Sequence, residues 1–540
     1  MADSEDLVKG LRGLLKIAVA DLTAQAEAGD AEWARQLRAE YDRAFAKGRT
    51  GQSWSVWRAS EVDQAGVSWV LSSVFVRFCE DNGLIDGVWI TGPGDRGQFA
   101  LDAEAVFYRQ DPSRNARDWL RQGFGVLADL PATSDVVSRG HSPVWRVPLG
   151  ADASKQTLDF WRETRDDGSL RWSLADPDLG TRFLGDIYQD LSEAAKKQYA
   201  LLQTPVFVEE FILDQTLDPA IAEFGLSEVK MIDPSCGSGH FLLGAFARLL
   251  EGWTEQAPGM DVRERVQRAL DQVHGVDLNP FAVDIARFRL TVAALKASGL
   301  SRLSEAPRYK YHLASGDSLL AGLGRQGVLL DDDGDLADHA YPAEDVHEHP
   351  GILEPGRYQV VVGNPPYITV KDKALNEAYR RAYPTCHRQY ALSVPFMELL
   401  FRLAVRGGLG SPAGFVGQIT SNSFMKREFG TKVIEDLLSG KDPDNPVDLT
   451  EVIDTSGAYI PGHGTPTVIL IGRRRAPVGQ TVHAVLGVRG EPGQPADAAR
   501  GLVWNEIVHR SDQLGFEGTY VSVRELPRSV LSRHPWSLSG

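Results

Sequence analysis

From residue 229 onward, short apolar segments alternate with longer helical ones, and this alternation constrains the possible fold more than any other feature. The segments VKMIDPS, VHGVDLNP, YHLASGDSL and YQVVVGNPPY begin at residues 229, 273, 311 and 358 and have the length and apolar character of strands. FLLGAFARLLEGW and FAVDIARFRLTVAAL, at 241–253 and 281–295, are typical of helices. Strands that alternate with helices indicate a doubly wound, mostly parallel α/β sheet. We therefore expect a Rossmann-like fold.

The spacing of the first two strands predicts one more helix. Asp277 follows Asp233 by 44 positions, whereas a compact strand-helix-strand unit repeats after roughly 30 residues. We therefore expect an extra helical segment around Asp261–Gln272. The next buried strand and its turn are expected in GFVGQITSNSFM, residues 414–425.

The first 190 residues are expected to form a separate, mainly helical domain. Apolar residues recur with helical spacing from Leu7 to Leu22, and helices are also expected over 31–46 and 67–82. In the segment QTPVFVEEFIL, a Thr-Pro turn is expected to open a further helix. We place a catalytic domain at 191–475 and a C-terminal segment at 476–540, which begins with a Gly/Pro-rich run.

Residues 331–350 form an acidic insertion that contains His339, His347 and His349. A metal site is conceivable there, but no helical or strand spacing brings the histidines together. We therefore expect a solvated surface insertion and no metal.

Composition indicates a globular protein of the cytoplasm. Hydrophobic residues make up 43% and charged residues 24%, as in ordinary globular domains. The three cysteines, Cys79, Cys236 and Cys386, show no disulfide or zinc spacing. The N-terminus lacks a signal-peptide pattern, and the apolar run Val67–Val76 is too short to span a membrane. The net charge of −16 disfavours a small DNA-coating protein but not an enzyme with a local basic lining.

A glycine-rich turn, DPSCGSGHF at 233–241, joins the first strand to the next helix. Such a turn lets the backbone approach a ligand closely and directs helix N-terminal N–H groups toward it. The dinucleotide pattern GxGxxG is not met, because Leu242 stands where the third glycine would be.

Polar residues also end the next two strands. Asp277 ends the second strand, and Asp317 and Ser318 follow the third. Ligands of open α/β sheets bind at the carboxyl ends of the strands, and a carboxylate there can accept ribose hydroxyls. Each aspartate alone could be a turn or capping residue. Together with the glycine-rich turn they favour a ligand that contains adenosine.

The fourth strand ends in the tetrapeptide Asn364, Pro365, Pro366 and Tyr367. Two prolines fix a stiff turn, but an ordinary turn does not account for the asparagine and the aromatic residue. The Asn364 side-chain oxygen and the Pro365 carbonyl can accept hydrogen bonds from an exocyclic amine of a purine. Tyr367 offers a face on which a base taken out of the helix can stack. No separate base is required.

These motifs, in this order, resemble motifs of the amino-group DNA methyltransferases, with QTPVFVEEF as the motif that precedes them in the gamma arrangement. The stretch LGDIYQDL and the N-terminal RFCEDNGLI resemble, more narrowly, the Eco57I-like and type IIG methylases and the PglX adenine methyltransferases of the phage-defence systems Pgl and BREX. The resemblance covers roughly residues 1–475. It implies a site-specific DNA methyltransferase that transfers a methyl group from S-adenosyl-L-methionine to N6 of a flipped adenine in double-stranded DNA. It also implies other phage-defence proteins as candidate partners.

The resemblance implies roles for matching residues. Donor-binding roles fall to Thr204, Pro205, Asp233, Pro234, Gly237, Gly239, Asp277 with Leu278, and Asp317 with Ser318. The target adenine would be held by Asn364, Pro365, Pro366 and Tyr367, with Tyr459 as a second residue that packs on the flipped base.

Two departures from the family bear on function. Family members carry a large target-recognition domain after the catalytic core, whereas about 65 residues follow it here. We therefore expect the chain to be truncated or split, and to bind DNA weakly and almost without sequence preference. No nuclease motif of the PD…(D/E)xK type is found in the N-terminal domain.

Two alternatives stay open. One is methylation of RNA or of a glutamine side chain, because an amide or a guanine amine suits the same tetrapeptide. The other is a donor-binding subunit of a defence complex without turnover.

Overall fold

The computed structural model describes residues 4–199, 202–321 and 341–539. The helices before residue 200 are α1 (Ser4–Ala28), α2 (Glu32–Ala46), α3 (Trp54–Asp81), α4 (Arg96–Gln110), α5 (Ala116–Asp129), α6 (Pro143–Arg146), α7 (Ala151–Trp161), α8 (Arg182–Leu191) and α9 (Glu193–Tyr199). Strands and helices then alternate: α10 (Val206–Phe224), β1 (Met231–Asp233), α11 (His240–Gln256), α12 (Val262–Asp271), β2 (Val273–Asp277), α13 (Pro280–Ala297), β3 (His312–Ser315), α14 (Ser318–Ala321), β4 (Val360–Gly363), α15 (Lys373–Ala382), α16 (Ser393–Leu403) and β5 (Phe415–Ser421). The remaining strands and α-helices are β6 (Asp448–Asp454), β7 (Thr467–Arg473), β8 (Thr481–Gly487), α17 (Leu502–Arg510), β9 (Val521–Pro527) and α18 (Arg528–Leu531).

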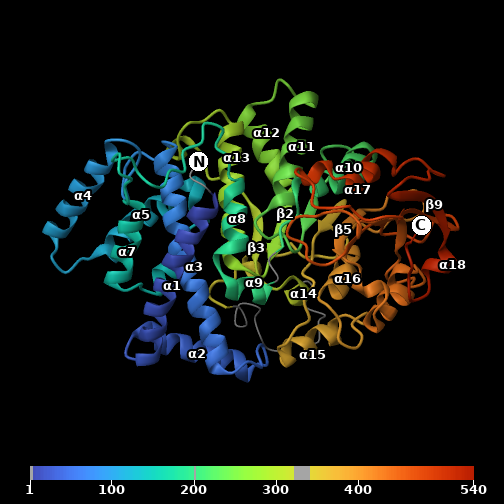
Figure 1. The fold of residues 1–540 in the computed structure, drawn as a ribbon, viewed down its shortest axis with the longest axis horizontal. Helices are drawn as coiled ribbons and strands as arrows, with labels where there is room; N and C mark the ends of the chain where they lie inside the picture. The colour runs from blue at the N-terminus through green and yellow to red at the C-terminus, as the bar shows by residue number, and fades with distance from the viewer. Residues whose placement is uncertain (1–3, 200–201, 322–340, 540) are drawn as a thin grey trace.

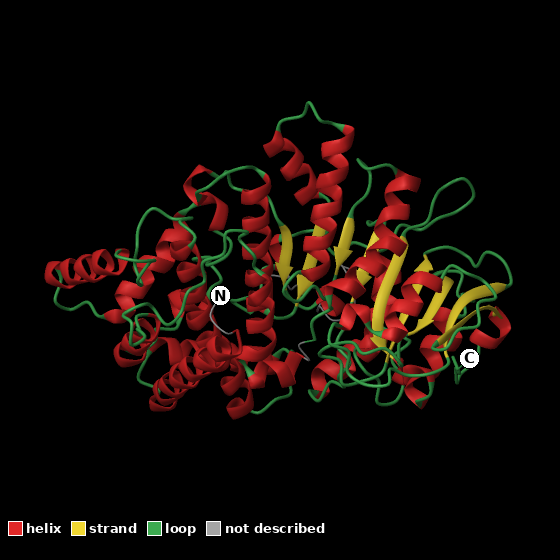
Figure 2. Ribbon diagram, turned by 45° about the horizontal axis from the view of Figure 1, so that its top comes forward, coloured by secondary structure: helices red, strands yellow, loops and turns green. Residues whose placement is uncertain are grey.

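The strands form one sheet in the order β3-β2-β1-β4-β5-β7-β6-β8-β9, seen in yellow in Figure 2. From β3 to β5 all neighbours are parallel, whereas β7 is antiparallel to both β5 and β6. The chain winds outward from β1 to β2 and β3, then returns to place β4 on the other side of β1. Ligands of open α/β sheets bind beside such a reversal, at the carboxyl ends of the strands.

Helices cover both faces of the sheet. Since successive residues of a strand point to opposite faces, neighbouring residues of one strand pack into different cores. Val360 and Val362 of β4 lie in a hydrophobic core shared with α10, α11 and α13. Val361, between them, lies in a second core shared with α15 and α16. The doubly wound α/β fold predicted from the sequence is confirmed.

The N-terminal helices pack against α13 (Figure 1). Phe75 of α3 stacks on Phe288 of α13 with ring centroids 4.6 Å apart, and Phe78 meets the same ring edge-on at 5.6 Å. The core therefore continues from the N-terminal helices into one face of the sheet.

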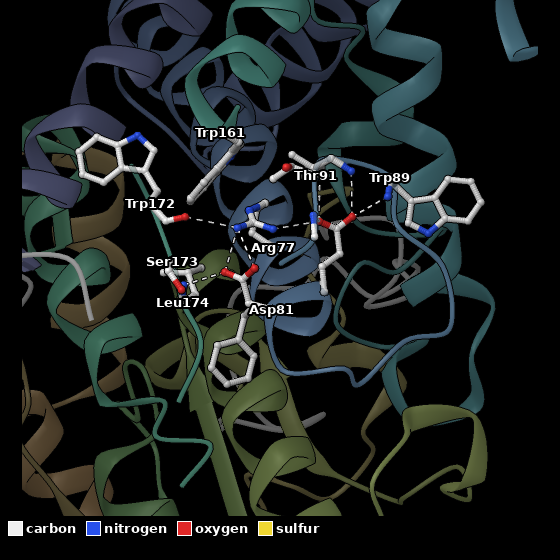
Figure 3. Close-up of polar contacts among 12 residues, drawn as sticks. Arg77, Asp81, Trp89, Thr91, Trp161, Trp172, Ser173 and Leu174 are labelled. Carbon is white, nitrogen blue, oxygen red and sulfur yellow. Dashed lines mark hydrogen bonds and ion pairs between the residues drawn. The ribbon is translucent and has the colours of Figure 1, made fainter. Parts of the chain in front are cut away.

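A buried cluster of charged side chains lies at the C-terminal end of α3 (Figure 3). The Arg77 guanidinium lies 3.1 Å from Glu80 and 2.8 Å from Asp81, and these side chains are at most 2% exposed. Glu80 accepts hydrogen bonds from four consecutive backbone N–H groups at 89–92. Asp81 accepts another from Leu174. Because every charge has partners, the cluster joins two loops to α3 without leaving an unpaired buried ion.

Most predicted elements are found with small shifts of their ends. The extra helix expected around Asp261–Gln272 is α12, and the Asp261 side chain caps it by accepting the Arg263 N–H at 2.9 Å. The helix expected over 67–82 begins earlier, at Trp54. Its first turns are partly exposed and polar, so apolar periodicity alone indicated only the buried part.

The C-terminal residues contribute to the same sheet. The catalytic domain was expected to end near residue 475, yet β8 pairs with β6 and β9 pairs with β8. The division into these three domains remains a prediction. No helix in the described ranges has both the length and the apolar character needed to cross a membrane.

The acidic insertion is described in part. Residues 331–340, including His339, lie outside the described residues. His347 and His349 are described, and His347 lies 3.8 Å from Glu348. Within residues 4–199, 202–321 and 341–539, no group of three or more potential metal ligands is found.

Candidate functional site

A cavity opens at the carboxyl ends of β1, β2 and β4, beside the reversal of the sheet. About 900 Å³ of space free of protein atoms lies within it, including open solvent at its mouth. Its walls contain predicted residues, namely Thr204, Asp233, Pro234, Gly237, Asp277, Leu278, Asp317, Ser318, Asn364 and Pro366. They also contain residues that were not predicted, among them Tyr188, Gln203, His240, Tyr379 and Phe396.

The glycine-rich turn between β1 and α11 forms the floor of the cavity. Gly237 and Gly239 adopt φ values of +53° and +87°, in the left-handed region that favours glycine. A Cβ on Gly239 would also lie 3.0 Å from the Ala286 side chain of α13. Asp233 is buried and accepts the Ser235 N–H at 2.9 Å. Burial raises the pKa of Asp233 to about 7.

Asp277 spans from the end of β2 to this turn. Its two carboxylate oxygens accept the N–H groups of Gly237 and Asn279, both at 2.8 Å. Each oxygen keeps a lone pair for a further donor, and the side chain lines the cavity. Burial raises the pKa of Asp277 to about 6, against the lowering effect of these two hydrogen bonds.

Asp317 contacts a helix that follows the fourth strand. One carboxylate oxygen accepts the N–H groups of Leu319 and Leu320, and the other accepts the Tyr379 hydroxyl of α15 at 2.6 Å. Burial raises the pKa of Asp317. Ser318 lies beside it and donates to the Pro234 carbonyl at 2.6 Å, so the third strand end is tied to the first.

The entrance of α10 forms a further wall. Thr204 is buried and lines the cavity, whereas Pro205 precedes the first turn of α10 and is not a lining residue. Gln203 accepts a hydrogen bond from His240 Nε2 at 3.1 Å. Burial lowers the pKa of His240 to about 3, with Arg289 and Arg182 adding to the effect, so the imidazole is neutral.

The Asn-Pro-Pro-Tyr turn places Asn364 at the cavity and Tyr367 next to it. The Tyr367 hydroxyl donates to Asn364 Oδ1 at 2.6 Å, and Asn364 Nδ2 lies 3.3 Å from Nε2 of His463. The rings of Tyr367 and His463 have centroids 6.0 Å apart. Burial raises the pKa of Tyr367 and lowers that of His463.

Some predicted residues do not reach the cavity wall. Gly239, Pro365 and Tyr367 belong to the two turns but do not line the cavity, and neither does the half-buried Tyr459. From the loop that carries Tyr459, the ring in contact with Tyr367 is that of His463. The proposed stacking role of Tyr459 remains a prediction.

Sequence reasoning missed several polar groups of the site, among them Gln203, His240 and Tyr379. Gln203 precedes the predicted Thr204, and His240 follows the glycine-rich turn, so their positions beside motifs were the available signal. Tyr379 had no such signal, because its contact with Asp317 depends on how α15 packs.

The wall chemistry fits S-adenosylmethionine. Asp277 retains acceptor capacity for ribose hydroxyls, and the backbone around Gly237 leaves space in which an added Cβ would come no closer than 3.8 Å to a neighbour. Leu278 is 41% exposed although it is a large apolar residue that lines the cavity. Leu278 and Phe396 both contribute apolar surface to the cavity wall.

Comparisons with known proteins agree with this chemistry. Residues 271–452 match the family model described as Eco57I restriction-modification methylase. The adenine-specific methyltransferase PglX of Streptomyces coelicolor is 52% identical, over 100% of this chain and 46% of that protein. The type II methyltransferase M.PaeR7I of Pseudomonas aeruginosa is 27% identical over 42% of this chain and 33% of its own length. The chain thus spans less than half the length of these relatives.

A solved structure shares the fold. It is that of the ATP-dependent Type ISP restriction-modification enzyme LlaBIII bound to DNA, which aligns with a TM-score of 0.50 at 13% identity. The alignment covers 90% of this chain and 30% of that one.

Proposed function

The chain is related along its whole length to an adenine-specific methyltransferase PglX and carries an Eco57I-type methylase segment, and from this premise we propose that it methylates N6 of adenine in double-stranded DNA. The methyl donor is S-adenosylmethionine. The reaction is that of a site-specific adenine DNA methyltransferase and belongs to a phage-defence or restriction-modification system, whose other proteins are candidate partners. We place this enzyme in the cytoplasm, because its three cysteines are free and buried and need no oxidising compartment.

The observation that carries this proposal is that one cavity is lined both by candidate donor-binding residues and by the candidate target-binding turn. Asp277 and Asp317 line it from β2 and β3, and Asn364 lines it from the turn after β4. A group transfer needs donor and acceptor held in line at short range. A cavity that merely stored a nucleoside would not require an amide side chain at its far wall.

On the donor side, residues of this chain bind and orient S-adenosylmethionine. Asp277 accepts the ribose hydroxyls, the Gly237 to Gly239 turn follows the donor closely, and Leu278 packs on its adenine ring. When bound, S-adenosylmethionine supplies a methyl group activated by a sulfonium charge.

On the target side, the turn receives the base. Asn364 Oδ1 and the Pro365 carbonyl accept hydrogen bonds from the exocyclic N–H groups, which localises the nitrogen lone pair for attack on the methyl group. The amine gives up one proton to solvent after transfer. Tyr367 presents its ring face to the flipped base.

Exposed cations near this turn support DNA as the substrate. Lys371, Lys373 and Arg381 follow the turn in sequence and are exposed, as are Lys426 and Arg427 after β5. An ion pair between Arg388 and Glu428, 3.1 Å apart, joins the two segments. In a chain with a net charge of −16, this local excess of cations provides the phosphate contacts that DNA binding needs.

The test is transfer of a labelled methyl group to duplex DNA, to RNA and to a glutamine-containing protein in parallel. We expect label in DNA, recovered as N6-methyladenine after digestion, and none with Asn364→Ala. Asn505→Ala, a substitution of an exposed asparagine on α17, should remain active. Label in RNA or glutamine instead of DNA would overturn the substrate assignment, and donor binding without transfer to any acceptor would overturn the enzymatic one.

A further inference from the structure

The loop between β6 and β7 brings a histidine to the Asn-Pro-Pro-Tyr turn from 99 positions further along the chain. His463 Nε2 lies 3.3 Å from Asn364 Nδ2. No role for this residue follows from the motifs identified in the sequence.

The loop holds the histidine through a tight turn. The His463 N–H donates to the Ile460 carbonyl at 3.2 Å, with Pro461 and Gly462 as the central residues. Gly462 has a φ of +79°. Proline followed by a glycine with positive φ is the signature of a type II turn, so the backbone that carries the imidazole is fixed.

The turn also sets the tautomer of the ring. His463 Nδ1 lies 3.2 Å from the Pro461 carbonyl, and a carbonyl oxygen can only accept, so Nδ1 carries the proton. Burial lowers the pKa of His463 and keeps the ring neutral. Nε2 is therefore unprotonated and can only accept a hydrogen bond.

This acceptor determines which end of the Asn364 amide faces which neighbour. The Tyr367 hydroxyl, on the other side of the amide, can donate or accept, so Tyr367 alone would allow both orientations. His463 can accept only from the NH₂ group. The Asn364 oxygen is consequently turned toward Tyr367 and away from the loop.

We propose that His463 is a positioning residue that orients the Asn364 amide with its oxygen available to the target amine. The inference rests on the proposed function of Asn364. The β6–β7 loop thereby keeps the Asn364 amide from turning its own N–H groups toward the substrate. Those N–H groups would repel the target amine, which must itself donate hydrogen bonds to the site.

The experiment compares three forms of the full chain: unchanged, His463→Leu and His463→Gln. Leucine fills similar space without an acceptor, whereas glutamine restores a side-chain oxygen. Loss of one hydrogen bond of ordinary strength predicts a fall in kcat of about three- to tenfold for His463→Leu. Glutamine should restore kcat to within about twofold of the unchanged chain. The Kd for S-adenosylmethionine and the Tm should be the same in all three.

Other kinetic results would overturn the inference. An unchanged kcat in His463→Leu would do so, as would a glutamine variant as impaired as the leucine variant. Equal losses of Tm and donor affinity would show that the histidine only supports the fold.

A second measurement does not depend on turnover. In the ¹⁵N spectrum of histidine-labelled protein, the signals of His463 are identified by their absence from the spectrum of His463→Gln. These signals should show that Nδ1 is protonated and Nε2 unprotonated at neutral pH. A cationic ring or an Nε2–H tautomer would overturn the inference. If the unchanged chain methylates nothing, the proposed function fails, and this spectrum then tests only whether His463 fixes the orientation of the Asn364 amide.

Discussion

The Tyr367 hydroxyl donates a 2.6 Å hydrogen bond to Oδ1 of Asn364, so the two side chains that frame the double proline are joined to each other. From the sequence, Tyr367 was expected to contribute only its aromatic face. The contact gives the hydroxyl a second task, because it holds the amide that is proposed to receive the target base.

Replacing Asn364 by alanine should abolish methyl transfer without affecting donor binding. Its proposed partner is the base, and no polar contact of its side chain with Asp277 or Asp317 is present in the described structure. Calorimetry with S-adenosylmethionine and a DNA methylation assay measure the two effects separately. The assignment fails if the variant still methylates adenine at a comparable rate.

Replacing Tyr367 by phenylalanine should have an intermediate effect. The aromatic face remains, but the hydrogen bond to Asn364 is lost, which costs roughly 0.5–1.5 kcal/mol and lowers kcat by up to about tenfold. Tyr367→Ala also loses stacking worth ~1–3 kcal/mol per base and should be much less active. If phenylalanine and alanine were equally damaging, stacking would contribute nothing.

Donor affinity should weaken as the pH falls through about 6. Burial raises the pKa of Asp277 to about 6, so the carboxylate proposed to accept the ribose hydroxyls is protonated below that pH and ionised above it. Asp277→Asn should bind S-adenosylmethionine weakly and lose most of this pH dependence, whereas Asp512→Asn, at an exposed site, should behave like the unchanged chain. Tight, unaltered donor binding by Asp277→Asn would contradict the ribose assignment.

The buried cluster at the end of α3 should dominate the stability of the N-terminal helices (Figure 3). Arg77→Met leaves Glu80 and Asp81 buried without their cation, and breaking such a pair costs about 3–5 kcal/mol. Arg302→Met removes an ion pair with Asp86 that is shorter, at 2.6 Å, but whose side chains are 58% and 60% exposed. It should change the free energy of unfolding by less than about 1 kcal/mol. Calorimetric Tm values of the two variants should therefore differ widely.

Much of the site could be assigned from sequence because its parts lie at strand ends. Asp233, Asp277, Asp317 and Asn364 each follow an apolar segment, and parallel strands place all their carboxyl ends at one edge of the sheet. Local patterns also predicted α12 from the spacing of two aspartates. These assignments needed only neighbours along the chain.

Contacts between distant segments were decided by tertiary packing. Tyr379 reaches Asp317 because α15 packs against α14, the helix that begins directly after Asp317. His463 reaches Asn364 because β7 pairs with β5 and carries its preceding loop to the same edge of the sheet. The sequence indicated Tyr459 as the aromatic residue of this loop near the base, whereas the structure brings the His463 ring to Tyr367. Tyr459 and His463 are close together in the sequence, so local sequence could not show which of them contacts Tyr367. The turn through Pro461 and Gly462 directs the His463 ring there.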